Sequence, residues 1–194
     1  MIRRIFALAS VALALTGCAT ANLSHAPVAA YRDTVNLAGS LSASFQKDGK
    51  LDSITVKYDW QQTPDRIDVN IATPLGQTVA KISVTPESAT LTQADRAPRV
   101  AKDLESLTRD ALGWSLPVSG LRDWLQGYAT GADGKRFTAS PFNNEVVTRD
   151  GWHVRFASWQ DDAAAVPQPK RIDASRLDTN GDALALRIAV RPAD

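Results

Sequence analysis

The chain has 194 residues, of which 44% are hydrophobic, and it contains 22 Lys and Arg residues and 21 Asp and Glu residues. This length suits one domain with a substantial core, and the balanced charge argues against a nucleic-acid partner or a polybasic membrane patch. The only cysteine is Cys18, which excludes an internal disulfide, a paired redox thiol and a thiolate cluster for zinc.

The first eighteen residues have the features of a lipoprotein export signal. Arg3 and Arg4 give it a positive start, and the apolar run over 5–15 is too short to span a bilayer comfortably. Leu15-Thr16-Gly17-Cys18 then follows the lipobox pattern, in which the thiol receives a diacylglyceryl group and cleavage makes the cysteine the new N-terminus. We therefore predict a signal peptide over 1–17, a lipidated N-terminus and tether over 18–30, and a single domain over 31–194.

The predicted mature chain begins at Cys18 and has no second long apolar segment, so its lipid is the expected anchor. Removing residues 1–17 leaves 177 residues with 20 Lys and Arg against 21 Asp and Glu, a formal charge of −1. A multiply acylated cysteine anchors stably, whereas a single acyl chain binds membranes marginally. Ala19 follows the cysteine where an aspartate retains many Gram-negative lipoproteins in the inner membrane, which favours the outer membrane.

Hydrophobic periodicity then predicts two sets of strands separated by two helices. Alternation with period two indicates strands over 35–46, 54–60, 67–71, 80–84, 89–93, 146–147, 152–156, 171–177 and 184–190. Helical spacing appears between the two sets, over 101–112 before Gly113, and again through Leu121, Trp124 and Leu125 before Gly127. The expected fold class is α+β, an antiparallel, meander-like sheet with helices inserted midway.

The sequence shows no constellation for catalysis. The mature chain has two histidines: His25 lies in the predicted tether, and His153 lies on a strand opposite its apolar face, where a solvated side chain is expected. No nucleophile elbow is present. The segment 178–182 resembles the start of a calcium loop but lacks the later ligands, so a hairpin turn explains it. We therefore expect no enzyme activity, no cofactor and no metal site.

Five tryptophans are spread along the chain, at positions 60, 114, 124, 152 and 159. One interpretation is that they fill a core in which the helices cap one sheet face. The other is that sheet and helices enclose an apolar cavity, the usual form of a small-ligand site. Periodicity alone favours the filled core and leaves the cavity open as an alternative.

The segment Pro74-Leu75-Gly76 joins two predicted strands, where a leucine between proline and glycine should face solvent. A lone exposed leucine is normal on a protein surface. On a membrane-tethered protein, however, such a leucine could enter lipid, and its full burial would contribute about 1.5–3 kcal/mol. We therefore predict that Pro74, Leu75 and Gly76 form a membrane-insertion loop.

Several segments in order resemble the LolB family of outer-membrane lipoprotein receptors. They are Trp60-Gln61-Gln62, Pro74 to Thr78, Gly113 to Val118 followed by Leu121, Trp124-Leu125 and Gly127, and then Asp150-Gly151-Trp152 and Trp159. The C-terminus departs from the pattern, because it ends in Arg191-Pro192-Ala193-Asp194 where many relatives end near a tryptophan. With the lipobox, the resemblance spans nearly the whole chain.

The resemblance implies an open antiparallel half-barrel whose helices cover an apolar cavity, and this shifts the interpretation of the tryptophans toward a cavity and its lid. It implies a monomeric receptor that accepts client lipoproteins by their acyl chains from a LolA-like periplasmic carrier and inserts them into outer-membrane lipid without ATP, with Leu75 on the family's protruding loop. The implied cavity and lid residues are Phe45, Tyr58, Trp60, Val69, Leu104, Leu107, Trp114, Leu121, Trp124 and Leu125.

Two other functions stay open at the level of the sequence. One is a related lipoprotein that binds free lipids or glycolipids in a similar cavity. The other is a structural outer-membrane lipoprotein with a filled core. A sizeable apolar cavity between sheet and helices would argue against the second.

Overall fold

The computed structural model describes residues 23–47, 49–94, 96–112, 116–177, 181 and 183–192. Its main element is a ten-stranded sheet with every pairing antiparallel, accompanied by two short helices and a separate two-stranded sheet. In chain order the elements are β1 (Val35–Lys47), β2 (Lys50–Thr63), β3 (Arg66–Ala72), β4 (Thr78–Val84), β5 (Ala89–Gln93), β6 (Arg99–Ala101), α1 (Leu104–Leu112), α2 (Val118–Trp124), β7 (Tyr128–Thr130), β8 (Arg136–Thr138), β9 (Glu145–Val147), β10 (His153–Trp159), β11 (Pro169–Leu177) and β12 (Ala183–Pro192).

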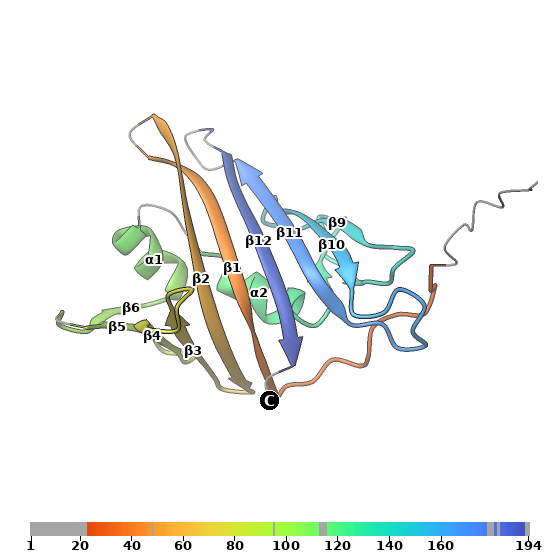
Figure 1. The fold of residues 1–194 in the computed structure, drawn as a ribbon, viewed down its shortest axis with the longest axis horizontal. Coiled ribbons are helices and arrows are strands. Elements are labelled where there is room, and N and C mark those ends of the chain that lie inside the picture. The colour runs from red at the N-terminus through yellow and green to blue at the C-terminus, as the bar shows by residue number, and fades with distance from the viewer. Residues whose placement is uncertain are drawn as a thin grey trace, which may run out of the picture.

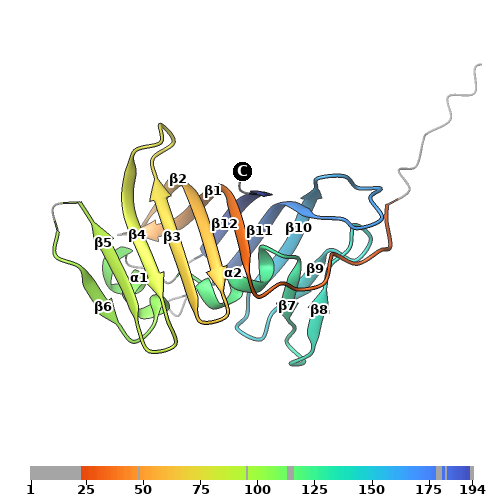
Figure 2. The ribbon, with the colours of Figure 1, turned by 90° about the horizontal axis from the view of Figure 1, so that it is seen from below.

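The large sheet joins two meanders, in the order β6-β5-β4-β3-β2-β1-β12-β11-β10-β9. The first and last strands of the fold, β1 and β12, pair at its centre, with Leu41 opposite Ile188. Figure 2 shows the sheet bending over α1 and α2, with β3 to β6 descending on one side and β10 and β9 on the other. This is the open, antiparallel α+β arrangement that the sequence predicts.

Alternating side chains explain the curvature and the position of the core. Along β12 every second residue is buried, from Leu184 through Leu186 and Ile188 to Val190, while the residues between them are exposed. The same alternation buries Tyr58 and Trp60 on β2. Because successive side chains in a strand point to opposite faces, one face of the sheet is mostly apolar and covers the helices, as predicted.

Both predicted helices are confirmed, and the structure gives the residue at which each begins. The first begins at Leu104 rather than 101, because Asp103 caps it through its Oδ1, which accepts from the Ser106 N–H at 2.7 Å. The second begins at Val118 after Pro117, whose carbonyl accepts from the Leu121 N–H at 2.8 Å. Strands β6, β7 and β8 were not predicted, whereas the equally short β9 was predicted from Val146 and Val147.

The described part of the predicted tether, residues 23–30, packs against the domain and is therefore no free linker. Val28 is buried, and its N–H donates to the Ala139 carbonyl at 3.0 Å. The Tyr128 hydroxyl donates to the Ala29 carbonyl at 2.6 Å, and the His25 ring stacks on Phe142. The small polar composition of this segment suggested a tether, whereas its backbone hydrogen bonds and one buried valine fix it in place.

Candidate functional site

An apolar cavity of about 180 Å³ lies between the inner face of β2 to β5 and the two helices. Aliphatic and aromatic side chains dominate its lining, and none of the described lining residues is charged. They are Leu41, Ile54, Val56, Tyr58, Trp60, Val69, Ile71, Val79, Ala80, Ile82, Leu91, Gln93, Leu104, Thr108, Leu116, Val118, Leu121, Leu125 and Ile188. Apolar walls without charges suit a hydrocarbon ligand.

Strand register places the cavity walls. Trp60 lies opposite Val69, and Val69 lies opposite Ile82, so one row of inward side chains crosses three strands. The helices cover the side of the cavity opposite the sheet. Leu104 of α1 and Leu121 of α2 line it and are both almost fully buried. The period of two in the strands and the helical spacing of the leucines thus bring these side chains around one common cavity.

The two hydroxyl groups at the cavity, of Thr108 and Tyr58, have hydrogen-bond partners within the protein. The Thr108 hydroxyl donates to the Leu104 carbonyl at 2.9 Å and accepts from the Leu116 N–H at 2.9 Å. The Tyr58 hydroxyl donates to the Ala189 carbonyl at 2.9 Å, and burial raises the pKa of Tyr58, which keeps the phenol neutral. Since these groups need no ligand partner, they add no polar recognition to the cavity.

Most of the predicted cavity residues are placed together by the structure. Tyr58, Trp60, Val69, Leu104, Leu121 and Leu125 all line the cavity. Leu107 and Trp124 are buried on the inner faces of α1 and α2, as predicted for helices that cover the sheet, but they lie outside the lining.

Two further predicted residues do not contribute to the described cavity wall. Phe45 is only partly buried and lies outside the lining, because it belongs to the part of β1 that extends beyond the cavity. Trp114 lies outside the described residues, as does Cys18, so the predicted lipid attachment stays a prediction.

Sequence reasoning missed several lining residues, although their signal was present. Ile71, Ile82 and Leu91 belong to the predicted alternating strands, and the strand register would have placed them beside Val69. Leu116 precedes α2 and carries no helical periodicity, whereas Val118 begins α2 and precedes Leu121 by three residues on the same buried face.

The Pro74-Leu75-Gly76 loop joins β3 to β4 and protrudes from the sheet (Figure 2). The side chain of Leu75 is 92% exposed, the largest exposure among the large hydrophobic residues described. The loop is closed by the Gly76 N–H donating to the Thr73 carbonyl at 2.9 Å and the Thr73 N–H donating to the Gln77 carbonyl at 2.8 Å. Gly76 has a φ of +93°, which favours glycine at this turn position. The predicted exposure of Leu75 is confirmed.

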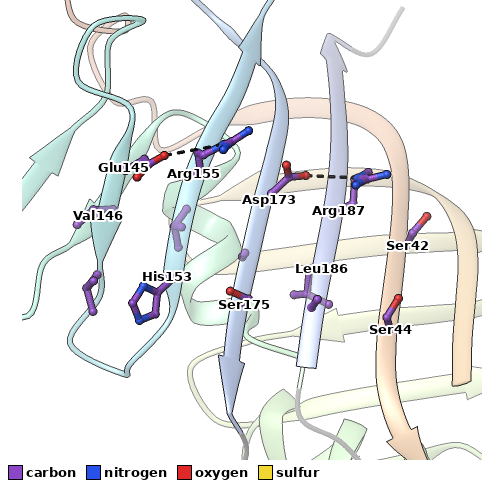
Figure 3. A pocket seen from close by; sticks show the side chains of 14 residues that line it. Ser42, Ser44, Glu145, Val146, His153, Arg155, Asp173, Ser175, Leu186 and Arg187 are labelled. Atoms are coloured by element: carbon purple, nitrogen blue, oxygen red, sulfur yellow. Dashed lines mark ion pairs between the residues drawn. The ribbon is translucent and has the colours of Figure 1, made fainter. Parts of the chain in front are cut away.

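A larger hollow, of about 700 Å³, lies on the opposite, outer face of the sheet and is lined largely by polar side chains (Figure 3). Two ion pairs cross it, Glu145 with Arg155 at 3.9 Å and Asp173 with Arg187 at 3.5 Å. Exposed pairs of this kind contribute little to stability. His153 lies here as an exposed strand residue, as predicted. The polar lining makes this hollow unsuited to acyl chains.

Within the part of the chain that the structure describes, no cluster of three or more histidine, cysteine, aspartate or glutamate side chains is placed to hold a metal ion. None of the described helices has the length and hydropathy needed to cross a bilayer.

Comparison with known proteins decides the family. The model of the family "Outer membrane lipoprotein LolB" matches residues 34–191. The chain belongs to the LolB family. It is 36% identical to the outer-membrane lipoprotein LolB of Cupriavidus necator over 155 residues, which cover 79% of this chain and 77% of that one. It is also 36% identical to LolB of Chromobacterium violaceum over 179 residues, covering 91% and 93% of the two chains.

A solved structure described as a LolA superfamily protein from Nitrosomonas europaea also resembles this chain, with 9% sequence identity and a TM-score of 0.45 over 84% of this chain and 88% of that one.

Membership of the LolB family makes the protein a lipid-anchored outer-membrane lipoprotein. The sequence resemblance to this family is thereby confirmed.

Proposed function

We propose that this protein receives lipoproteins from a LolA-like periplasmic carrier and deposits them in the outer membrane, holding their acyl chains in the cavity under α1 and α2. The observation that carries the proposal is an uncharged apolar cavity in a member of an outer-membrane lipoprotein family. A filled core, which the structural alternative requires, would leave no such space.

The physical need for such a receptor follows from the cost of hydrating acyl chains. Exposing one chain of about fifteen methylenes to water costs on the order of 12 kcal/mol at ~0.8 kcal/mol each. A lipoprotein therefore needs an apolar host at both ends of its path through the periplasm. Transfer requires no nucleotide when each host binds the acyl chains more tightly than the previous one. Each step then runs toward the tighter host.

The volume of the cavity bears on how it is loaded. About 180 Å³ is below the ~300–1,000 Å³ of typical ligand pockets, so the helices must shift to admit acyl chains. α2 is tied to its surroundings, because Arg122 donates to the Tyr31 hydroxyl at 3.3 Å and to the Pro64 carbonyl at 3.2 Å. α1 meets the sheet through Leu104 and Leu107 and is joined to α2, because Glu105 Oε1 accepts from the Ser119 N–H at 3.2 Å and from the Ser119 hydroxyl at 2.8 Å. Widening the cavity through α1 therefore requires these two hydrogen bonds to break.

The Leu75 loop supplies the contact with the membrane in this proposal. Its leucine is almost fully exposed and has no neighbouring strand face to join. Transferring it into lipid is favourable by about 1.5–3 kcal/mol, which is enough to hold the loop at a bilayer surface when the protein is already tethered nearby.

A two-stage transfer assay tests the proposed function. A carrier loaded with a labelled triacylated lipoprotein is mixed with the full lipidated protein in liposomes, without ATP, and the client is followed to the protein and then to the bilayer. We expect the client to leave the carrier. A client that stays on the carrier would overturn the proposal, and recovery of phospholipid or glycolipid as the ligand, read by mass spectrometry, would favour the free-lipid alternative.

A further inference from the structure

The apolar lining does not end where the cavity closes, but continues along the inner face of β2 toward one rim of the sheet. Trp60 is 3% exposed and Tyr58 7%, Val56 is half-buried, and Ile54 reaches 42%. All four side chains point to the same face, because they alternate along one strand. The chemistry stays apolar while the exposure rises in one direction.

β4 shows the same progression toward the same rim. Ile82 and Ala80 are buried, whereas Val79 is 40% exposed and still lines the cavity. A register irregularity falls at this point, where Ala72 lies opposite Thr78 after Ile71 has paired with Ala80. The irregularity accommodates Val79 at the end of the ladder, next to the loop that carries Leu75.

The opposite end of the cavity is closed. Gln62 is 1% exposed and Ile67 6%, and these two residues pair at the far end of β2 and β3. Gln62 is also fixed by polar contacts, since its Oε1 accepts from Trp60 Nε1 at 3.2 Å and its Nε2 donates to the Tyr31 hydroxyl at 3.1 Å. A hydrocarbon chain would have to break this buried network to leave here.

The strand lengths explain why one end is open. The pairing of β2 with β3 stops at Lys57 opposite Ala72, so β2 residues before Lys57 extend beyond the shorter strand. Figure 1 shows the β1–β2 hairpin reaching well past β3 and β4. The inner side of this extension carries Ile54 opposite Ala43, which continues the apolar wall beyond the end of β3.

We propose that the acyl chains of a client enter and leave the cavity at this rim, over Ile54 and Val79, beside the Leu75 loop. The inference rests on the proposed function and adds the route. It places the Leu75 loop, the proposed membrane contact, beside the outlet of the cavity. An acyl chain that emerges over Val79 then meets lipid where Leu75 enters the bilayer, and so avoids crossing water.

Charged substitutions test the route. Ile54→Asp and Val79→Asp place a carboxylate in the outlet but at partly exposed sites where folding can tolerate it. The matched controls are Thr55→Asp, on the outer face of the same strand, and Val100→Asp, at the exposed edge strand β6 beside α1. The probe is a triacylated cysteine lipopeptide delivered by the carrier to the full lipidated protein, and circular dichroism checks folding.

We expect the two rim variants to accept the lipopeptide at least tenfold more slowly than wild type, and the two controls to stay within twofold. Slowing by Val100→Asp alone would place the outlet at the β6 edge and overturn the route while leaving the receptor function intact. Failure of wild type to accept the lipopeptide would overturn the proposed function itself.

Photocrosslinking gives a second measurement that detects contact with the acyl chain directly. Benzoylphenylalanine at position 79 or at position 100 is activated during transfer of the same lipopeptide. Adducts at 79 in excess of those at 100 support the rim route, and the reverse ratio contradicts it.

Discussion

The two halves of the sheet have the same construction but opposite interiors. On the β2–β5 side the inner face consists mostly of aliphatic residues and leaves a cavity of about 180 Å³. On the β9–β12 side large rings fill the space. The ring of Trp152 meets that of Trp124 edge-on, with 5.7 Å between the ring centroids, and Phe156 stacks between Phe137 and Trp159. One half contains the proposed binding site, and the other is a packed scaffold.

The difference shows how one fold combines a stable frame with a deformable site. Close packing confers stability and resists change in volume, which suits the scaffold half and the segment 23–30 that packs beside it. A cavity costs stability because its lining loses dispersion contacts, but it provides the space that an acyl chain can occupy. α2 stands between the two, since it buries Leu121 toward the cavity and Trp124 toward Trp152.

The largest expected effect is on stability in the scaffold half. Phe156→Ala removes a fully buried ring and should lower the free energy of unfolding by about 3–5 kcal/mol. Leu91→Ala on the cavity side should cost near the lower end of the ~2–5 kcal/mol range, because its side chain already borders empty space. Urea denaturation of both variants measures this. Equal losses would contradict the contrast between the halves.

Filling each half separates binding from stability. Val69→Phe should place extra volume in the cavity, reduce lipopeptide binding at least tenfold and change the unfolding free energy by less than about 1.5 kcal/mol. The matched change Ala174→Phe, at a 2% exposed position of the scaffold half, should instead destabilise by about 1–3 kcal/mol through overpacking. Isothermal binding and denaturant titration of both variants test the pair, and unaffected binding in Val69→Phe would locate the ligand elsewhere.

Substitution at loop tips gives a smaller and purely functional effect. Leu75→Glu should leave folding and acceptance from the carrier unchanged, but slow deposition into liposomes several-fold, because a charged tip enters the apolar layer at a cost. Val166→Glu is the control, since it is also an exposed loop residue but belongs to the scaffold half. Equal rates of deposition by wild type and Leu75→Glu would contradict the proposed contact of Leu75 with the membrane.

The smallest effect concerns Asp123, in α2 between the halves. Burial raises the pKa of its carboxyl above 3.8, although Arg136 and Arg122 oppose this. A raised folded-state pKa stabilises the protein below the unfolded pKa, and this contribution is lost as the pH rises through the folded value. Asp123→Asn should therefore be slightly more stable than wild type at pH 7 and lose this advantage toward pH 4. Thermal melts at both values check the sign.

Much of the cavity half could be predicted from the sequence, because long strands such as 35–46 and 67–71 show their inward faces by alternation. The exposure of Leu75 could be predicted from Pro74 and Gly76, since this turn chemistry is local. The motifs also indicated the family before the fold was known.

The remainder depended on contacts that periodicity does not encode. The sequence could not show that Trp124 faces the scaffold while Leu121 faces the cavity, because both lie on one helical stripe and only the curvature of the sheet separates them. The composition of residues 23–30 indicates a tether and does not reveal their hydrogen bonds to Ala139 and Asp162, because these join residues far apart in the sequence. The open rim at Ile54 and Val79 results from unequal strand lengths after pairing.

The most direct test of the central claim is methyl NMR of the full lipidated protein, in nanodiscs, with and without a triacylated cysteine lipopeptide. We predict chemical-shift changes and intermolecular contacts at the methyls of Val69, Ile82, Leu91 and Leu104, with the methyls of Ile172 and Val154 in the scaffold half unchanged. Perturbation centred on Ile172 and Val154, with the cavity methyls silent, would contradict the account.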